Sequence, residues 1–201
     1  MSRMFGNIVV ADAAAALLAV FESIRPALTR SGFANALVVF AGWVLTTGSH
    51  AITQALVETD TARRQHHEAF HRFFSRGTWN PDEIGLILLD RLLKLMAADA
   101  PIGLVIDDTL AAKKGPSVFG IGNHLDAVRS TKAVRVFTFG HVWVTLCVLI
   151  NVPFSRRPWA LPILFRLYRN EKDCAASDVK FRKKTELARD MLDVLLARQE
   201  I

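Results

Sequence analysis

The pattern of apolar residues changes at Pro101, and this change divides the chain into two parts. Before Pro101, apolar residues recur at the three- and four-residue intervals of amphipathic helices. After it come short apolar runs rich in β-branched and aromatic residues, a pattern that is typical of strands. The sequence therefore predicts an α+β fold, with a helical domain over residues 1–100 and a second domain over residues 101–201.

The first part predicts helices with recognisable ends. Asn80 and Pro81 combine an N-cap with a first-turn proline, and the acidic Asp82 and Glu83 follow near the positive end of the helix dipole. Phe33–Leu45 is apolar nearly all round, which indicates a buried helix. The helices are predicted over Ala11–Ile24, Phe33–Leu45, His50–Thr59, Ala62–Ser75 and from Pro81 to about Ala98.

The second part predicts three strands and one helix. An apolar run, Ile102–Asp107, reads as a strand that delivers Asp107 and Asp108 to a turn. Neighbouring side chains on a strand point to opposite faces, so only one of these carboxylates can serve a given site. A long polar connection, two further strands and a final helix follow; Pro162 predicts that the last strand is an edge strand. Their ranges are Thr109–Val134, Arg135–Ile150, Pro158–Tyr168 and Asp178–Gln199.

The charge and composition of the chain indicate which kind of partner it binds. The formal net charge of +6 and the pI near 9.7 favour an anionic partner such as DNA. Cys147 and Cys174 make neither a disulfide framework nor a metal site, which fits a reduced cytoplasm. No apolar run reaches the roughly 18–20 residues of a membrane span. We therefore expect a cytoplasmic protein that has no membrane partner.

One short motif suggests metal chemistry. His67, Glu68 and His71 spell H-E-x-x-H, in which two histidines on one helix face bind zinc and the glutamate acts as general base. Flanking arginines and phenylalanines instead favour a basic and aromatic helix edge that packs and contacts solvent. A zinc-dependent hydrolase therefore stays open as an alternative function, with Asp82, Glu83 and Asp90 as possible third ligands.

Basic side chains gather in two places that could contact phosphates. Arginines flank or lie on the helix that carries the motif, and a lysine pair follows the first strand. A solvated surface is the ordinary reading of such charges. The candidates for DNA binding are Arg63, Arg64, Arg72, Arg76, Lys113 and Lys114.

Several segments, in order and spacing, resemble the DDE transposases of bacterial insertion sequences, whose catalytic domain is ribonuclease-H-like. They are Gly42–His50, His71–Asn80, Leu104–Thr109, Gly122–Ser130, Phe139–Val144, Leu161–Arg169 and Lys184–Leu192. In that family the aspartate directly before threonine holds metal, so the resemblance implies that Asp108 is the first catalytic carboxylate. It also implies Mg²⁺ or Mn²⁺ as cofactor and DNA as substrate.

The same resemblance predicts an incomplete catalytic set. The family places its second aspartate on a strand just after the helix matching Lys184–Leu192, and a glutamate later still, whereas this sequence stops at Ile201. Asp126 is excluded as the second aspartate, since it is close to Asp108 and no strand is predicted before it. We expect an N-terminal portion, inactive alone, that works as a homo-oligomer or with the C-terminal half of a transposase. A non-catalytic DNA-binding regulator is the other alternative.

Overall fold

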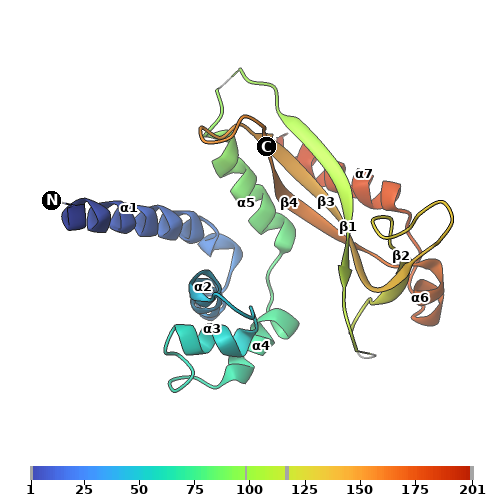
Figure 1. Ribbon diagram of the computed structural model, residues 1–201, viewed down its shortest axis with the longest axis horizontal. Helices are drawn as coiled ribbons and strands as arrows, with labels where there is room; N and C mark the ends of the chain where they lie inside the picture. Colours follow the sequence, from blue (N-terminus) through green and yellow to red (C-terminus); the bar gives the residue numbers. More distant parts are fainter. Residues whose placement is uncertain (1, 98, 116–117, 200–201) are drawn as a thin grey trace. The chain divides into compact units, whose positions relative to one another are not determined.

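The computed structural model describes residues 2–97, 99–115 and 118–199, and it confirms the α+β class (Figure 1). The chain forms two compact units, residues 1–88 and residues 89–201. Helices make up the first unit, and the second is built around an antiparallel sheet. None of the helices in the described ranges combines the length and the apolar character needed to cross a bilayer.

Packing in the first unit centres on three fully buried side chains. Val39, Leu56 and Phe70 come from three different helices and are at most 1% exposed. Gly42 permits the close approach between two of these helices, because a Cβ there would lie 2.4 Å from the carbonyl oxygen of Ala55. The helical elements are α1 (Ser2–Ser23), a 3-10 turn (Arg25–Ala27), α2 (Arg30–Leu45), α3 (Ile52–Glu58), α4 (His67–Arg76) and α5 (Pro81–Leu93).

The start of one predicted helix differs from the structure, and the predicted start of another is confirmed. The helix predicted from Ala62 begins only at His67, because a turn precedes it and the His66 ring nitrogen accepts the backbone N–H of Glu68 at 3.3 Å. This side-chain cap fixes the start of α4. The predicted cap of α5 is confirmed, since Asn80 Oδ1 accepts the backbone N–H of Asp82 at 2.9 Å.

The sheet of the second unit is organised around its longest strand, β3. Gly140 of β3 pairs with Ala112 of β1 on one edge and with Gly122 of β2 on the other. From Val142 onward, β4 takes the place of β2 along that second edge. All pairings are antiparallel, and the strands are β1 (Gly103–Ala112), β2 (Gly122–Leu125), β3 (Phe137–Ile150) and β4 (Trp159–Tyr168).

The second unit contains more structure than the sequence predicts. The expected turn after Asp108 is wrong, because β1 continues to Ala112 in register with β3. The expected loop Thr109–Val134 contains β2, so the described ranges hold four strands rather than three. The final helix α7 (Lys184–Gln199) starts later than expected, since Asp178 has a φ of 49°, and a short helix α6 (Glu171–Ala176) precedes it. A left-handed residue cannot continue a right-handed helix.

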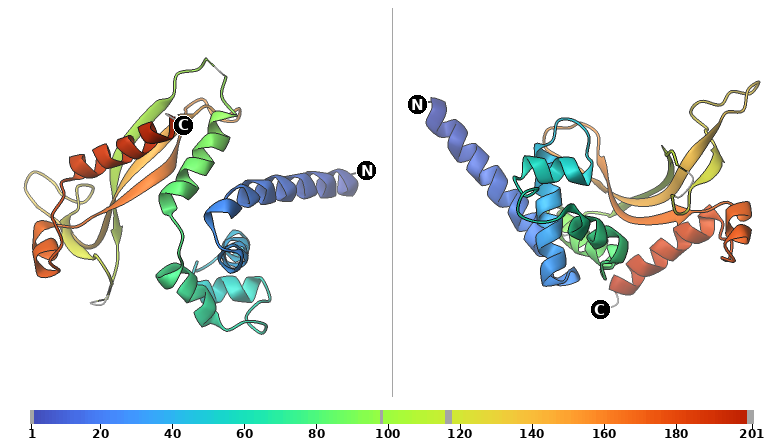
Figure 2. Two further views of the ribbon diagram at one scale, coloured as in Figure 1. Left: turned by 180° about the vertical axis from the view of Figure 1, so that it is seen from behind. Right: turned by 90° about the horizontal axis from the view of Figure 1, so that it is seen from below.

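Helix α7 covers one face of the sheet (Figure 2). Its Leu187, Met191 and Leu195, spaced four residues apart, are buried as the sequence predicts. Even-numbered residues of β3, such as Val144, are buried on the same side. On the opposite face Trp143 is 36% exposed. Side chains that point toward α7 therefore share a sheltered environment next to the helix.

Candidate functional site

The strand register gathers three polar side chains on the face that α7 covers. Asp108 of β1 lies opposite Val144 of β3, His124 of β2 opposite Thr138, and Tyr168 of β4 opposite Val142. Directly opposed residues of an antiparallel pair point to the same face, and the three β3 partners are all even-numbered. One face of the sheet thus collects an acid, an imidazole and a phenol from three strands.

Asp107 and Asp108 lie inside β1, and their side chains diverge. Asp107 lies opposite Thr145, on the other face of the sheet from Asp108. Its Oδ1 accepts the backbone N–H of Asp108 at 2.8 Å. The predicted divergence of the two carboxylates agrees with this register, and only Asp108 can approach α7.

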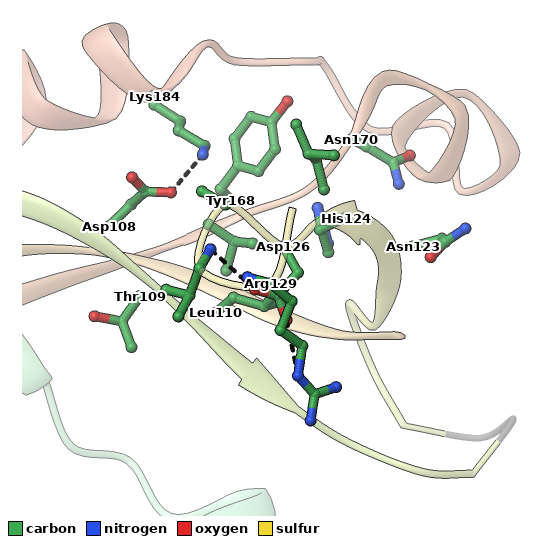
Figure 3. A pocket seen from close by; sticks show the side chains of 14 residues that line it. Asp108, Thr109, Leu110, Asn123, His124, Asp126, Arg129, Tyr168, Asn170 and Lys184 are labelled. Carbon is green, nitrogen blue, oxygen red and sulfur yellow. Dashed lines mark hydrogen bonds and ion pairs between the residues drawn. The ribbon is translucent and has the colours of Figure 1, made fainter. Parts of the chain in front are cut away.

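Lys184, the first residue of α7, meets Asp108. Its Nζ donates to Asp108 Oδ2 at 2.5 Å, and the same Nζ lies 5.2 Å from the centre of the Tyr168 ring (Figure 3). Both charged side chains are a little over 40% exposed, so water screens their attraction. The pair nevertheless positions a cation directly at the carboxylate.

A pocket of about 770 Å³ opens beside this ion pair. Its walls come from all four strands, the turn after β2, and the segments that begin α6 and α7 (Figure 3). Cationic and amide side chains are prominent among its lining. The lining residues with polar or charged side chains are Asp108, Thr109, Asn123, His124, Asp126, Arg129, Tyr168, Asn170 and Lys184.

His124 is the most deeply buried polar side chain of the pocket, at 7% exposure. Its ring lies 5.9 Å from that of Tyr168, and its Nε2 has no hydrogen-bond partner in the described part of the chain. Burial lowers the pKa of His124 below its usual value, an effect that the charge of Asp173 partly opposes. Lys184 and His141 lower this pKa further. The neutral imidazole is accordingly favoured over the imidazolium.

Asp126 also lines the pocket, but its carboxylate stabilises a turn. Its Oδ1 accepts the backbone N–H groups of Val128 and Arg129 at 3.1 and 3.0 Å, and its Oδ2 accepts the Thr138 hydroxyl at 3.0 Å. These hydrogen bonds hold the pKa of Asp126 below its usual value, and the bond from the Arg129 backbone has the largest effect. The sequence predicts no strand before Asp126, and this prediction is wrong, because β2 ends at Leu125, directly before it. The hydrogen bonds that Asp126 accepts nevertheless indicate a structural role and not that of a second catalytic aspartate.

The described residues do not by themselves make a metal site. Residues 2–97, 99–115 and 118–199 contain no group of three His, Cys, Asp or Glu side chains that could hold an ion. Within the pocket, Oδ2 of Asp108 is bonded to Lys184, and both oxygens of Asp126 are engaged. A two-ion site needs further carboxylates to bridge and hold the ions. Asp108 alone offers one ligand.

The H-E-x-x-H segment is arranged differently from a zinc site. The rings of His67 and His71 lie 5.8 Å apart at the surface, edge to face. Glu68 accepts the Arg72 guanidinium at 3.0 and 2.5 Å, which holds the pKa of Glu68 below its usual value. A carboxylate held in an ion pair is a weaker base than a general base requires.

The basic candidates for DNA binding fall into separate groups. Four lie on or just before α4 in the first unit and two lie directly after β1 in the second; all six are exposed. Arg64 lies 3.6 Å from Asp60. The approach of Lys184 to Asp108 is not predictable from the sequence. The sequence shows only that Lys184 lies in a cluster of basic residues and begins the family-like segment Lys184–Leu192.

Comparison with known proteins places the chain in a family. The family described as DDE superfamily endonuclease matches residues 23–201, which is most of the chain. The chain belongs to this family of transposase-like nucleases. Nucleases of this superfamily generally use divalent metal ions. Neither the curated proteins nor the solved structures that were compared include a match to the chain.

Proposed function

We propose that the chain is the N-terminal portion of a DDE transposase of the bacterial insertion-sequence type, which binds DNA in the cytoplasm. The observation that carries this proposal is the position of Asp108: it faces the pocket beside α7, with Lys184 at its carboxylate. The family resemblance assigns Asp108 as the first carboxylate that holds Mg²⁺ or Mn²⁺. Such ions stabilise the attacking and leaving oxygens of a phosphodiester.

The hydrogen-bond donors that line the pocket support a phosphate ligand. Lys184 and Arg129 contribute two cations, and Asn123 and Asn170 contribute amide groups. Each carboxylate lies beside a cation: Asp108 is bonded to Lys184, and Asp126 accepts two backbone N–H groups and lies 3.9 Å from Arg129. Charge-assisted hydrogen bonds from such donors suit phosphate oxygens. A DNA backbone that follows this pocket would bring a phosphate next to Asp108.

We also propose that catalysis needs residues beyond those described here. One available carboxylate cannot hold two ions, so the chain alone should leave DNA uncut. A second copy, or the C-terminal half of a transposase, would supply the remaining ligands. A non-catalytic DNA-binding regulator would also fit a single carboxylate. Adding the C-terminal half of a transposase distinguishes the regulator from the transposase. Cleavage that then depends on Asp108 supports the transposase.

DNA binding is tested by fluorescence anisotropy with a short labelled duplex at several salt concentrations. We expect weak, largely sequence-independent binding whose affinity falls as salt rises, because phosphate contacts release counterions. Arg76→Gln should reduce the salt slope by about one, while Lys94→Gln, a matched loss of one exposed charge that is not among the candidate DNA-binding residues, should leave the slope unchanged. Absent binding at low salt would refute the DNA partner.

DNA cleavage is tested separately with supercoiled plasmid and Mg²⁺ or Mn²⁺. The chain alone should produce no nicks above background. Nicking by the isolated chain that disappears in Asp108→Asn would show that a full site exists within it, and the composite-site proposal would be abandoned.

A further inference from the structure

Three polar atoms converge on Gly122 at the margin of the pocket. A Cβ built on Gly122 would lie 2.3 Å from Asp173 Oδ2, 2.9 Å from Asn170 Nδ2 and 2.9 Å from His124 Nε2. These contacts are too close for any side chain, so only glycine allows the three groups to approach one another here. An aspartate from α6 is thereby brought next to the histidine of β2.

Two of these atoms are buried without a partner. Neither His124 Nε2 nor Asp173 Oδ2 has a hydrogen-bond partner among the described residues, although both are shielded from solvent. Asn170 is fixed instead, because its Oδ1 accepts the backbone N–H of Asp173 at 2.9 Å and caps α6. Buried polar groups are normally satisfied. Both atoms lie over Gly122 with no direct hydrogen bond between them, so the carboxylate acts on the imidazole through its charge.

We propose that Asp173 positions His124 as a phosphate-binding group of the pocket, and that the imidazole takes up a proton when a phosphate enters. The charge of Asp173 favours the imidazolium, and the Nδ1 proton, taken from solvent, is donated to a phosphate oxygen. Asp173 acts through His124 and is a positioning residue. The inference deepens the proposed function, on which it rests for the identity of the phosphate as part of DNA.

The charged groups around His124 determine how its pKa responds when a phosphate binds. Asp173 of α6 favours the imidazolium, whereas Lys184 of α7 and His141 of β3 disfavour it. The Tyr168 phenol of β4 packs beside the ring, and Asp108 of β1 is neutralised by Lys184. Burial outweighs Asp173, and the free imidazole is neutral. A bound phosphate adds a negative charge, so it raises the pKa of His124 and its own affinity falls as pH rises.

The first test uses inorganic phosphate alone, with the full chain. Nuclear magnetic resonance follows the His124 ring signal against pH, with and without phosphate. We expect the midpoint to lie below the ordinary value of 6.5 in the free chain and to move upward with phosphate. In Asp173→Asn both midpoints should be lower, because the charge that favours the imidazolium is lost, while phosphate should leave the exposed His50 signal unchanged in either protein. A His124 midpoint that phosphate leaves unchanged would overturn the proposal.

The second test measures duplex affinity by anisotropy between about pH 5.5 and 8. Wild-type affinity should weaken by up to about tenfold per pH unit through the titration of His124. His124→Gln should flatten this dependence, and His50→Gln should retain it. An equal slope in wild type and His124→Gln would refute the inference even though DNA binds. Failure of DNA to bind, with a phosphate-induced shift at His124, would instead refute only the DNA substrate.

Discussion

Lys184 Nζ lies 2.5 Å from Asp108 Oδ2, although the two residues are 76 positions apart in the sequence. The ammonium group at the start of α7 therefore occupies the side of the carboxylate where another cation would bind. Because both side chains are partly exposed, the pair can open without disrupting the core. Lys184 therefore competes with any other cation that approaches Asp108 Oδ2.

Replacing Lys184 should make Asp108 a better cation ligand. We expect Lys184→Met to bind Mn²⁺ severalfold more tightly than wild type, since an exposed ion pair is worth up to about 1 kcal/mol. Titration of free Mn²⁺ by electron paramagnetic resonance measures this change. Lys183→Met removes a neighbouring charge and should have a smaller effect, and adding Asp108→Asn should abolish the gain. Unchanged Mn²⁺ affinity in Lys184→Met would show that the pair does not compete with cations.

The H-E-x-x-H segment should not hold zinc. Glu68 is bonded to Arg72, and His66 caps the helix through its ring nitrogen. Elemental analysis of purified protein should find well under one zinc per chain, and His67→Ala should not alter that content. One equivalent of zinc that is lost in His67→Ala would support the zinc-dependent hydrolase instead.

Asp190 should make stability depend on pH in the acid range. Its carboxylate accepts Arg166 Nε at 2.6 Å and lies 3.2 Å from Arg182 Nη2, and the hydrogen bond from Arg166 is the main cause that lowers its pKa below 3.8. A depressed folded-state pKa stabilises the fold above the unfolded-state value, and this stability is lost as pH falls through the folded-state pKa.

Urea unfolding of Asp190→Asn tests this contribution. At neutral pH the variant should lose about 1 kcal/mol of unfolding free energy, a figure kept small because Asp190 is 36% exposed. The difference from wild type should shrink as pH falls below about 4, because Asp190 becomes protonated first in the unfolded and then in the folded state, which leaves a neutral side chain as in the variant. A difference that stays constant down to acid pH would contradict the ion-pair account.

The free edge of β1 should exchange its backbone hydrogens quickly. In the described ranges β1 pairs only with β3, and Leu104, Val105 and Ile106 are 36–39% exposed. Hydrogen exchange measured by mass spectrometry should therefore be faster at Leu104–Ile106 than at Val144–Val148, which has a strand on each side. Apolar edges also pair with other chains, so protection at β1 should rise with protein concentration. Equal, concentration-independent protection in a monomer would mean that the edge is already covered.

The sequence by itself determined the features that depend on neighbouring residues. The change at Pro101, the cap at Asn80, the edge position of the strand with Pro162 and the opposite faces of Asp107 and Asp108 all follow from local stereochemistry. Periodicity and capping act over a few residues, so they are readable from the chain. The buried positions of α7 were predictable for the same reason.

Only the tertiary structure decided which distant side chains meet. The continuation of β1 past Asp108 and the existence of β2 depend on their pairing with β3, which the polar loop sequence does not reveal. The same strand register places Asp108 and His124 on one face, and the packing of α7 against that face delivers Lys184. Contacts between residues far apart in sequence depend on the register and packing of whole elements, and no local pattern encodes them.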